Sequence, residues 1–191
     1  MDRKLRGYLK KGEYIRWQGN PARFELLEGV YHTRILGQWI LAVLFGSGTL
    51  VAYLSMGGEK NPGVIGLVLL VAVVLILSPL MERRNIRGQR YWITDQRLIL
   101  MCRDRSLYYM PLQDVDTCRI IRDQTEWPCL AVGGAVLEDA EKLLRWRACH
   151  PKVEMEAKNT DECAAGMIFY GIKNADAAWK LIQPYLKRQA A

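Results

Sequence analysis

The chain has 191 residues, of which 50% are hydrophobic and 25% are charged, and its formal net charge is +7. This composition excludes a disordered protein, a collagen-like protein and a small disulfide-stabilised protein. Two long segments without any charged residue also argue against a freely soluble protein.

The first twenty residues predict a short basic segment followed by a strand. Leu5 and Leu9 stand one helical turn apart among basic residues, which fits either an amphipathic turn on an anionic leaflet or a frayed, solvated end. Residues 13–18 alternate between apolar and polar in the manner of a strand. Asn20 and Pro21 then predict the start of an interfacial helix that leads into the first apolar segment.

Two apolar segments, residues 35–56 and 62–81, contain no Asp, Glu, Lys or Arg. As helices they are about 33 and 30 Å long, close to the thickness of the hydrocarbon core of a bilayer. Since only five residues separate them, the sequence predicts a transmembrane helical hairpin over residues 35–82. The alternative, a pair of buried core helices, usually involves runs shorter than about 18 residues. Pro79 is expected to kink or end the second helix.

Basic residues predict the orientation of this hairpin. The loop between the spans offers only Lys60, which is offset by Glu59. By the positive-inside rule, both chain ends are expected in the cytoplasm, which makes this a multi-pass protein of the inner membrane. The five cysteines all follow the hairpin and are therefore expected to be reduced. The flanking arginines are Arg16, Arg23, Arg34, Arg83, Arg84, Arg87, Arg90 and Arg97.

Small residues in the first span predict a close helix contact. Ala42 and Gly46, and again Gly48 and Ala52, are four residues apart and allow two backbones to approach each other. Packing within the hairpin is the first interpretation and a subunit interface is the second. Neither span contains Asp, Glu, Lys, Arg or His, which argues against a proton relay, an ion pathway or an intramembrane protease.

From about residue 88, the chain is predicted to be rich in strands and to end in a helix over residues 174–188. Pro184 is expected to kink or shorten that helix, and residues 123–141 and 149–166 are predicted to be long loops. The predicted strands are 90–94, 97–103, 106–110, 115–122, 142–148, 153–157 and 166–172. At the first hairpin turn, Thr94 and Asp95 are expected to form turn hydrogen bonds, and Arg97 to pair with Asp95 or a nearby carbonyl.

Four sequence segments around the predicted hairpin match known patterns in order. Residues 91–100 (YWITDQRLIL) follow the pattern Y-x-[IL]-T-[DN]-x-R-[LI]-[IL], and residues 9–21 follow L-x-x-G-E-x-[IL]-x-W-x-G-x-P. Residues 110–115 are similar to an I-P-L-x-x-I strand, and residues 169–176 with the following helix complete the series. Together they resemble the membrane-associated bacterial pleckstrin-homology-like family, called PH-like below.

The resemblance implies an α+β membrane protein with a cytoplasmic PH-like roll or barrel of about seven strands, closed by the C-terminal helix. Residues 1–34 would supply the first strand, residues 35–82 the hairpin and residues 83–191 the remainder of the domain. It also implies frequent homo-oligomers, and no catalytic residue is carried over from the family. The expected function is a non-enzymatic, membrane-anchored interaction or scaffold module that self-associates or binds protein partners.

Two groups of residues are candidate contact sites. Anionic lipid is expected to contact Arg83, Arg84, Arg87 and Arg90, although positive flanks also occur on almost any such hairpin. The alternative function, an accessory subunit of a larger membrane complex, would use an apolar loop that could equally pack back onto the domain. Its docking residues are Trp127, Pro128, Leu130 and Val132.

An enzyme is disfavoured, because no GxSxG, HExxH, P-loop or GxGxxG motif is present. Cys149, His150 and Cys163 do not form a convincing metal-ligand pattern, because adjacent strand residues point to opposite faces. No cofactor, metal or small-molecule substrate is therefore expected. Residues 82–191 carry 18 basic and 15 acidic side chains, so a nucleic-acid partner is not expected either.

Overall fold

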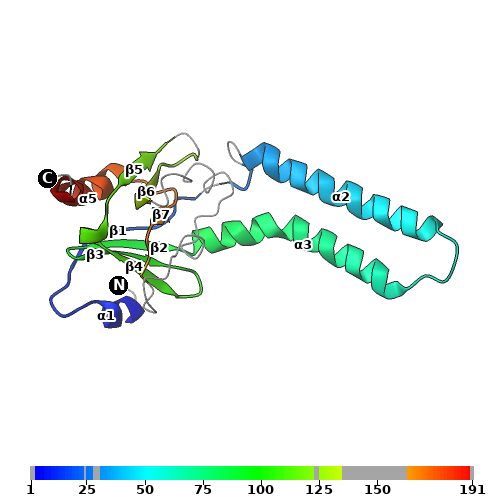
Figure 1. Ribbon diagram of the computed structural model, residues 1–191, viewed down its shortest axis with the longest axis horizontal. Coiled ribbons are helices and arrows are strands. Elements are labelled where there is room, and N and C mark those ends of the chain that lie inside the picture. Colours follow the sequence, from blue (N-terminus) through cyan, green and yellow to red (C-terminus); the bar gives the residue numbers. More distant parts are fainter. Residues whose placement is uncertain (1–2, 24, 28–30, 123–124, 135–162, 190–191) are drawn as a thin grey trace. The chain divides into compact units, whose positions relative to one another are not determined.

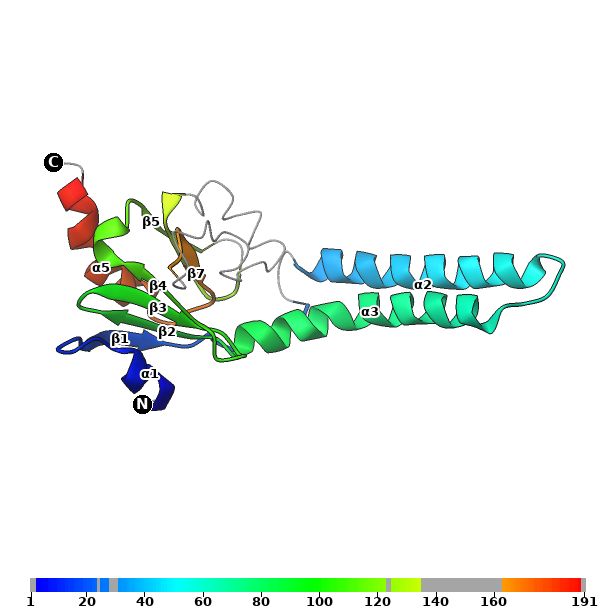
Figure 2. The same ribbon diagram turned by 60° about the horizontal axis from the view of Figure 1, so that its bottom comes forward.

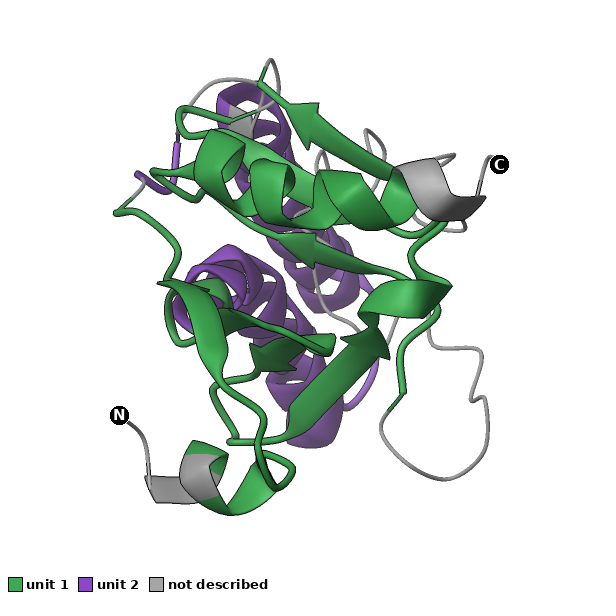
Figure 3. Ribbon diagram, turned by 90° about the vertical axis from the view of Figure 1, so that its left-hand side faces the viewer, with its two compact units in different colours: residues 1–24, 85–191 green, residues 25–84 purple. Residues whose placement is uncertain are grey.

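The computed structural model divides into two compact units, shown in different colours in Figure 3. Unit 1, called the α+β domain below, comprises residues 1–24 and 85–191, and unit 2, called the hairpin unit, comprises residues 25–84. The structure describes residues 3–23, 25–27, 31–122, 125–134 and 163–189.

Two long apolar helices confirm the helical part of the sequence prediction. They are α2 (Tyr31–Ser55) and α3 (Pro62–Arg87), shown in Figure 1, and both are long and apolar enough to cross a membrane. Most of their large apolar side chains are exposed, which fits contact with lipid. Pro79 was expected to kink or end the second helix. It does not end the helix, because α3 continues to Arg87.

The predicted interfacial helix after Asn20 is also wrong for the residues that the structure describes. Residues 21–23 and 25–27 are not helical, and α2 begins at Tyr31. Long-range pairing gives the physical reason, since the Ala22 N–H donates a hydrogen bond of 2.7 Å to the Gly171 carbonyl. This pairing places the segment beside another part of the α+β domain instead of in a helix.

Four strands form an antiparallel sheet, called sheet A, in the order β1-β2-β3-β4, and they lie side by side in Figure 2. Strand β1 pairs with β2 although the whole hairpin separates them in sequence, with Trp17 opposite Ile93. The strands predicted at these four places are confirmed, with ends shifted by a few residues. Their bounds are β1 (Ile15–Gly19), β2 (Arg90–Thr94), β3 (Arg97–Met101) and β4 (Leu107–Pro111).

Three further strands form a second antiparallel sheet, called sheet B, in the order β5-β6-β7. The predicted loop over residues 123–141 is wrong in part, because β6 is a strand with no exposed surface. The predicted strands 142–148 and 153–157 lie outside the described residues. The strands are β5 (Cys118–Ile121), β6 (Cys129–Val132) and β7 (Met167–Phe169), and a short 3-10 helix, η1 (Leu112–Asp114), precedes them.

The C-terminal helix α5 (Ala175–Gln189) packs against β5 and also touches β6 and η1. The predicted apolar stripe on this helix is confirmed, since Ala178 and Ile182 are fully buried in the main core. Pro184 does not shorten the helix, which runs five residues beyond it. The chain is thus α+β, with two apolar helices, two antiparallel sheets and a terminal helix.

Both faces of sheet A are apolar at β2 and β3, because successive side chains of a strand point to opposite faces and most of them here are apolar. Tyr91, Ile93, Leu98 and Leu100 belong to the main core, which also contains residues of sheet B and α5. The opposite face carries a second cluster, which α1 (Arg3–Tyr8) helps to cover by burying Leu5 completely. Figures 1 and 2 show α1 and α5 on opposite sides of sheet A. The short amphipathic turn is therefore present as α1, but Leu5 packs against sheet A and not against a leaflet. The prediction of a frayed, solvated end is wrong for the described residues.

Candidate functional site

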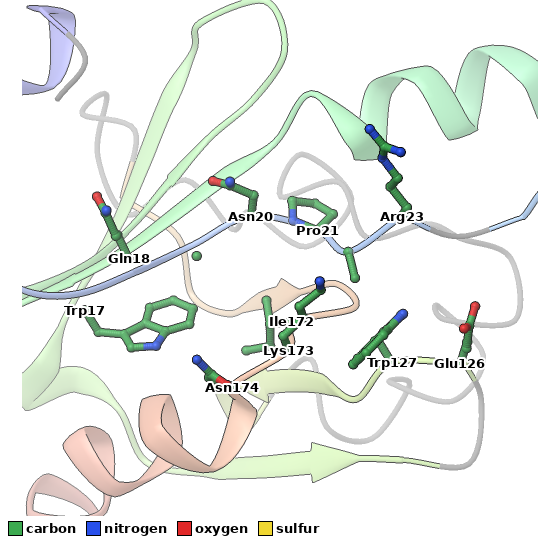
Figure 4. Close-up of a pocket in the computed structure, with 12 residues that line it drawn as sticks. Trp17, Gln18, Asn20, Pro21, Arg23, Glu126, Trp127, Ile172, Lys173 and Asn174 are labelled. Atoms are coloured by element: carbon green, nitrogen blue, oxygen red, sulfur yellow. The ribbon is translucent and has the colours of Figure 1, made fainter.

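A cleft of about 570 Å³ in the α+β domain is the candidate functional site, and Figure 4 shows its lining. This volume lies within the range of sites that bind small molecules or short peptide segments. Three segments that are far apart in sequence meet here. The lining residues are Trp17, Gln18, Gly19, Asn20, Pro21, Ala22, Arg23, Glu126, Trp127, Ile172, Lys173 and Asn174.

Backbone hydrogen bonds hold the three segments together. The Ala22 N–H donates to the Gly171 carbonyl at 2.7 Å, and the Ile172 N–H donates to the Pro128 carbonyl at 2.8 Å. Gly171 has a φ of +53°, which a glycine adopts without the strain of a side chain. Its N–H donates to the Cys129 sulfur at 3.2 Å. Because all of these hydrogen bonds join parts of the protein to each other, the cleft does not require a ligand to form.

Trp17 forms one wall of the cleft and belongs to a stack of three aromatic rings. Its indole stacks on Phe169 with 6.1 Å between ring centroids, and Phe169 stacks on Tyr91 with 4.6 Å between centroids. The ring also lies across Gly19, where a Cβ atom would overlap it. The stack joins β1 and β2 of sheet A to β7 of sheet B, so the core of the domain sets the position of this wall.

Trp127 lies across the cleft from Trp17, with Ile172 and Lys173 between the two indoles in Figure 4. The Lys173 ammonium lies 5.4 Å from the centre of the Trp127 ring, a cation–π contact. This contact leaves the charge of the exposed Lys173 at the cleft rather than buried in the protein.

Two of the four predicted docking residues are not on the surface. Leu130 and Val132 have no exposed area, because their strand β6 is the central strand of sheet B. Trp127 and Pro128 remain half-buried, and Trp127 lines the cleft. The signal for the strand was a run of four apolar residues bounded by Pro128 and Gly133, which is typical of a buried strand.

The four arginines predicted to contact lipid lie on two elements. Arg83, Arg84 and Arg87 are in the last turns of α3, and Arg90 begins β2. Arg84 and Arg87 are exposed and, three residues apart, share one face of the helix. Arg90 is exposed and Arg83 is half-buried.

The two pairs of small residues in α2 have different surroundings. Ala42 is buried, and a Cβ atom on Gly46 would lie 3.5 Å from the Cβ of Ala72 in α3, so this pair packs within the hairpin. Ala52 is exposed, and nothing lies within 4 Å of a Cβ atom at Gly48. The interpretation as hairpin packing therefore applies to the first pair only.

Two side chains of α2 compensate for the proline in α3. Pro79 has no N–H, so the carbonyl of Leu75, four residues earlier, lacks its helical donor. The Gln38 side chain donates to that carbonyl at 2.9 Å, and the Trp39 indole donates to the next one, on Ile76, at 3.1 Å. These bonds give the carbonyls beside the proline donors, which any helix that crosses a bilayer would need.

Gln38→Leu is expected to lower the stability of the hairpin by about 0.6–1.7 kcal/mol, from the average to the largest value measured for hydrogen bonds between membrane helices. The effect should be smaller in a Pro79→Ala background, because alanine supplies the missing N–H. The measurement is unfolding in mixed micelles followed by helical ellipticity. Thr49→Val, at an exposed position of α2, is the control and should change little. Equal losses from Gln38→Leu in both backgrounds would contradict the explanation.

The first hairpin turn is held by a buried ion pair that the sequence did not predict. Arg97 pairs with Glu13 through Nε and Nη2, each 2.9 Å from a different carboxylate oxygen, and not with Asp95. Its guanidinium also donates to the Tyr8 carbonyl at 2.7 Å and contacts the rings of both Tyr8 and Tyr109. The pair thus attaches the N-terminal segment to sheet A.

Thr94 holds the turn as predicted, whereas the Asp95 side chain bonds to the segment before β1 and not within the turn. The Thr94 hydroxyl accepts hydrogen bonds from the N–H groups of Gln96 and Arg97 and lies 2.8 Å from the Glu13 carboxylate. The Asp95 carboxylate accepts one from the Tyr14 N–H at 3.0 Å. These residues of the motif therefore build structure and do not form a reactive site.

Two of the cysteines, Cys118 and Cys129, have surroundings that do not favour a reactive thiolate. Burial raises the pKa of the Cys118 thiol to about 12, so this thiol stays protonated at physiological pH. Cys129 is fully buried. Cys149 and His150 lie outside the described residues, and no group of three or more potential metal ligands occurs within the described ranges.

Comparison with models of protein families, with curated proteins and with solved structures finds no match to this chain.

Proposed function

We propose that this protein is a non-enzymatic interaction module of PH-like fold, anchored in the inner membrane by α2 and α3 and facing the cytoplasm. The two exposed apolar helices carry the anchoring part of this proposal. In the described part of the chain, seven strands in sheets of four and three, with a C-terminal helix packed on the core, support a PH-like arrangement. The module would bind a protein partner or a second copy of itself.

The pairing of β1 with β2 supports the proposed topology. Strand β1 precedes the hairpin and β2 follows it, yet they share one antiparallel ladder from Ile15 opposite Thr94 to Gly19 opposite Tyr91. Strands that share a ladder lie on the same side of a membrane. Both ends of the hairpin must then emerge on that side, and the arginine-rich flanks favour the cytoplasm.

The exposed arginines Arg84 and Arg87 suit contact with the anionic headgroups of the inner leaflet. Replacing both with Gln should lower the amount of anionic lipid that co-purifies with the chain.

The accessory-subunit alternative has less support, because Leu130 and Val132 are in the core of the α+β domain. A single homomeric species on a native gel of solubilised membranes would argue against that alternative.

Labelling of introduced cysteines tests the anchoring and the topology. Glu59→Cys, in the loop between α2 and α3, should react with a membrane-impermeant maleimide in intact cells. Lys11→Cys, an exposed position of the α+β domain, is the matched variant and should react only after permeabilisation. The protein should also resist alkaline extraction from membranes. Reaction of Lys11→Cys in intact cells, or release at alkaline pH, would overturn the proposal.

A further inference from the structure

The cleft offers many more hydrogen-bond donors than its own residues use. Within the described part of the chain, no hydrogen bond or ion pair involves the indole N–H of Trp17 or Trp127 or the guanidinium of Arg23. The side-chain amides of Gln18, Asn20 and Asn174 are likewise unpaired among the described residues. Tryptophan N–H groups normally find a partner when their ring is buried. The two half-buried indoles therefore suit a ligand that supplies acceptors.

The charges around the cleft favour a single negative charge on that ligand. Arg23 and Lys173 are exposed cations, and Glu126 is an exposed carboxylate on the same lining. The lining thus has a net charge of about +1. A carboxylate matches this balance better than a phosphate monoester, which carries close to two charges at neutral pH. Charge-assisted hydrogen bonds from lysine and arginine to a carboxylate are stronger than neutral ones.

The cleft also has apolar surface for the rest of such a ligand. The rings of Trp17 and Trp127 lie on either side of Ile172, and Pro21 adds a further apolar surface. Trp17 cannot turn freely, because it is stacked on the buried Phe169. An apolar or aromatic group gains contact with the indoles without first ordering them, which lowers the entropic cost of binding.

From these features we infer that the cleft binds an organic carboxylate whose apolar body lies against Trp17 and Trp127. The carboxylate would accept hydrogen bonds from Lys173 and from the neighbouring amides. A free aromatic carboxylate and the carboxyl end of a peptide chain share this chemistry. The inference goes beyond membrane anchoring and does not depend on it, because every lining residue belongs to the α+β domain.

This inference is tested by titrating the full chain in nanodiscs with N-acetyl-phenylalanine. Calorimetry and saturation-transfer NMR measure the binding. Binding is expected with a Kd below about 1 mM, and N-acetyl-phenylalanine amide should bind about tenfold more weakly because it lacks the charge. The peptide Gly-Gly-Phe with a free carboxyl group distinguishes the two sources. Tighter binding of this peptide would indicate a chain end, and weaker binding a free carboxylate.

Variants connect the binding to the cleft. Lys173→Met should weaken binding of N-acetyl-phenylalanine about tenfold, whereas Lys180→Met, which removes an exposed charge on α5 outside the cleft, should leave it unchanged. Trp127→Ala should weaken the acid and the amide equally. Unchanged urea midpoints of both lysine variants show that the domain is folded. Equal binding of acid and amide, no binding of either, or equal effects of the two lysine variants would overturn the inference.

Discussion

Arg97→Met is expected to lower the free energy of unfolding of the α+β domain by about 3–5 kcal/mol, the range for breaking a buried ion pair on one side. The Glu13 side chain has no exposed surface and that of Arg97 is 7% exposed. Without the guanidinium, the carboxylate loses two hydrogen bonds of 2.9 Å and its opposite charge while remaining out of water. The substitution also removes the donor to the Tyr8 carbonyl, so the N-terminal segment should loosen.

The measurement is urea unfolding of the chain in detergent, followed by near-ultraviolet circular dichroism. The pair Arg122–Asp176 is a matched control, because its 2.7 Å contact is as short but its side chains are 57% and 66% exposed. Asp176→Ala should therefore cost less than about 1 kcal/mol. Glu13→Leu combined with Arg97→Met should recover part of the loss, since no buried charge remains. Equal losses at the two ion pairs would contradict this account.

The same pair predicts a loss of stability in acid. Burial by itself raises the pKa of Glu13. The hydrogen bonds from Arg97, from the Lys10 N–H and from Thr94, with the charge of Arg97, outweigh burial and hold the pKa below its ordinary value of 4.5. A carboxyl with a lowered pKa stabilises the fold above its unfolded pKa and loses this contribution as the pH falls through its folded pKa. The urea concentration at the unfolding midpoint should therefore decrease as the pH is lowered below 4.5. In the Glu13→Gln variant, the part of this decrease that is due to Glu13 should be absent.

Phe169→Ala is expected to destabilise the α+β domain by about 3–5 kcal/mol, as is usual when a buried phenylalanine is truncated. Its ring is fully buried and lies between the rings of Trp17 and Tyr91, so its removal leaves a cavity between sheet A and sheet B. Tyr91 is also tied to this region through its hydroxyl, which lies 3.1 Å from the Tyr170 N–H. The surroundings therefore have little freedom to collapse into the cavity.

Urea unfolding with the same readout measures this effect. Phe169→Leu keeps most of the volume and should cost clearly less than Phe169→Ala. Tyr14→Ala removes an aromatic side chain that is 60% exposed and should cost little. Because Phe169 supports Trp17, the alanine variant should also weaken binding of N-acetyl-phenylalanine. A loss no larger than that of Tyr14→Ala would show that the stack does not hold the sheets together.

The hairpin helices and the strands of sheet A were predictable from local sequence. A run of 20 or more apolar residues specifies a long apolar helix whatever surrounds it. In β2 and β3, alternate residues such as Ile93 and Leu98 pair across a two-residue turn, and the pattern of side chains fixes the pairing. Such features depend on near neighbours in the chain. They are therefore visible in one sequence.

The short strand β6 was less visible, because four consecutive buried residues, Cys129–Val132, have no alternation to mark a strand. The burial of Leu5 depends on the second face of sheet A, whose apolar residues lie about 90 positions further along the chain. The helix expected after Asn20 failed for a similar reason. A hydrogen bond between Ala22 and Gly171 outweighed the local preference.

The sequence by itself determined the apolar hairpin, the basic flanks and the hairpin of β2 and β3, because short-range periodicity and charge specify them. Only the tertiary structure decided the partner of Arg97 and the cleft. Glu13 lies 84 residues from Arg97, and the cleft joins the segments 17–23, 126–127 and 172–174. Contacts over such distances result from the packing of two sheets around one core. Local preferences do not encode that packing, and the candidate binding site depends on it.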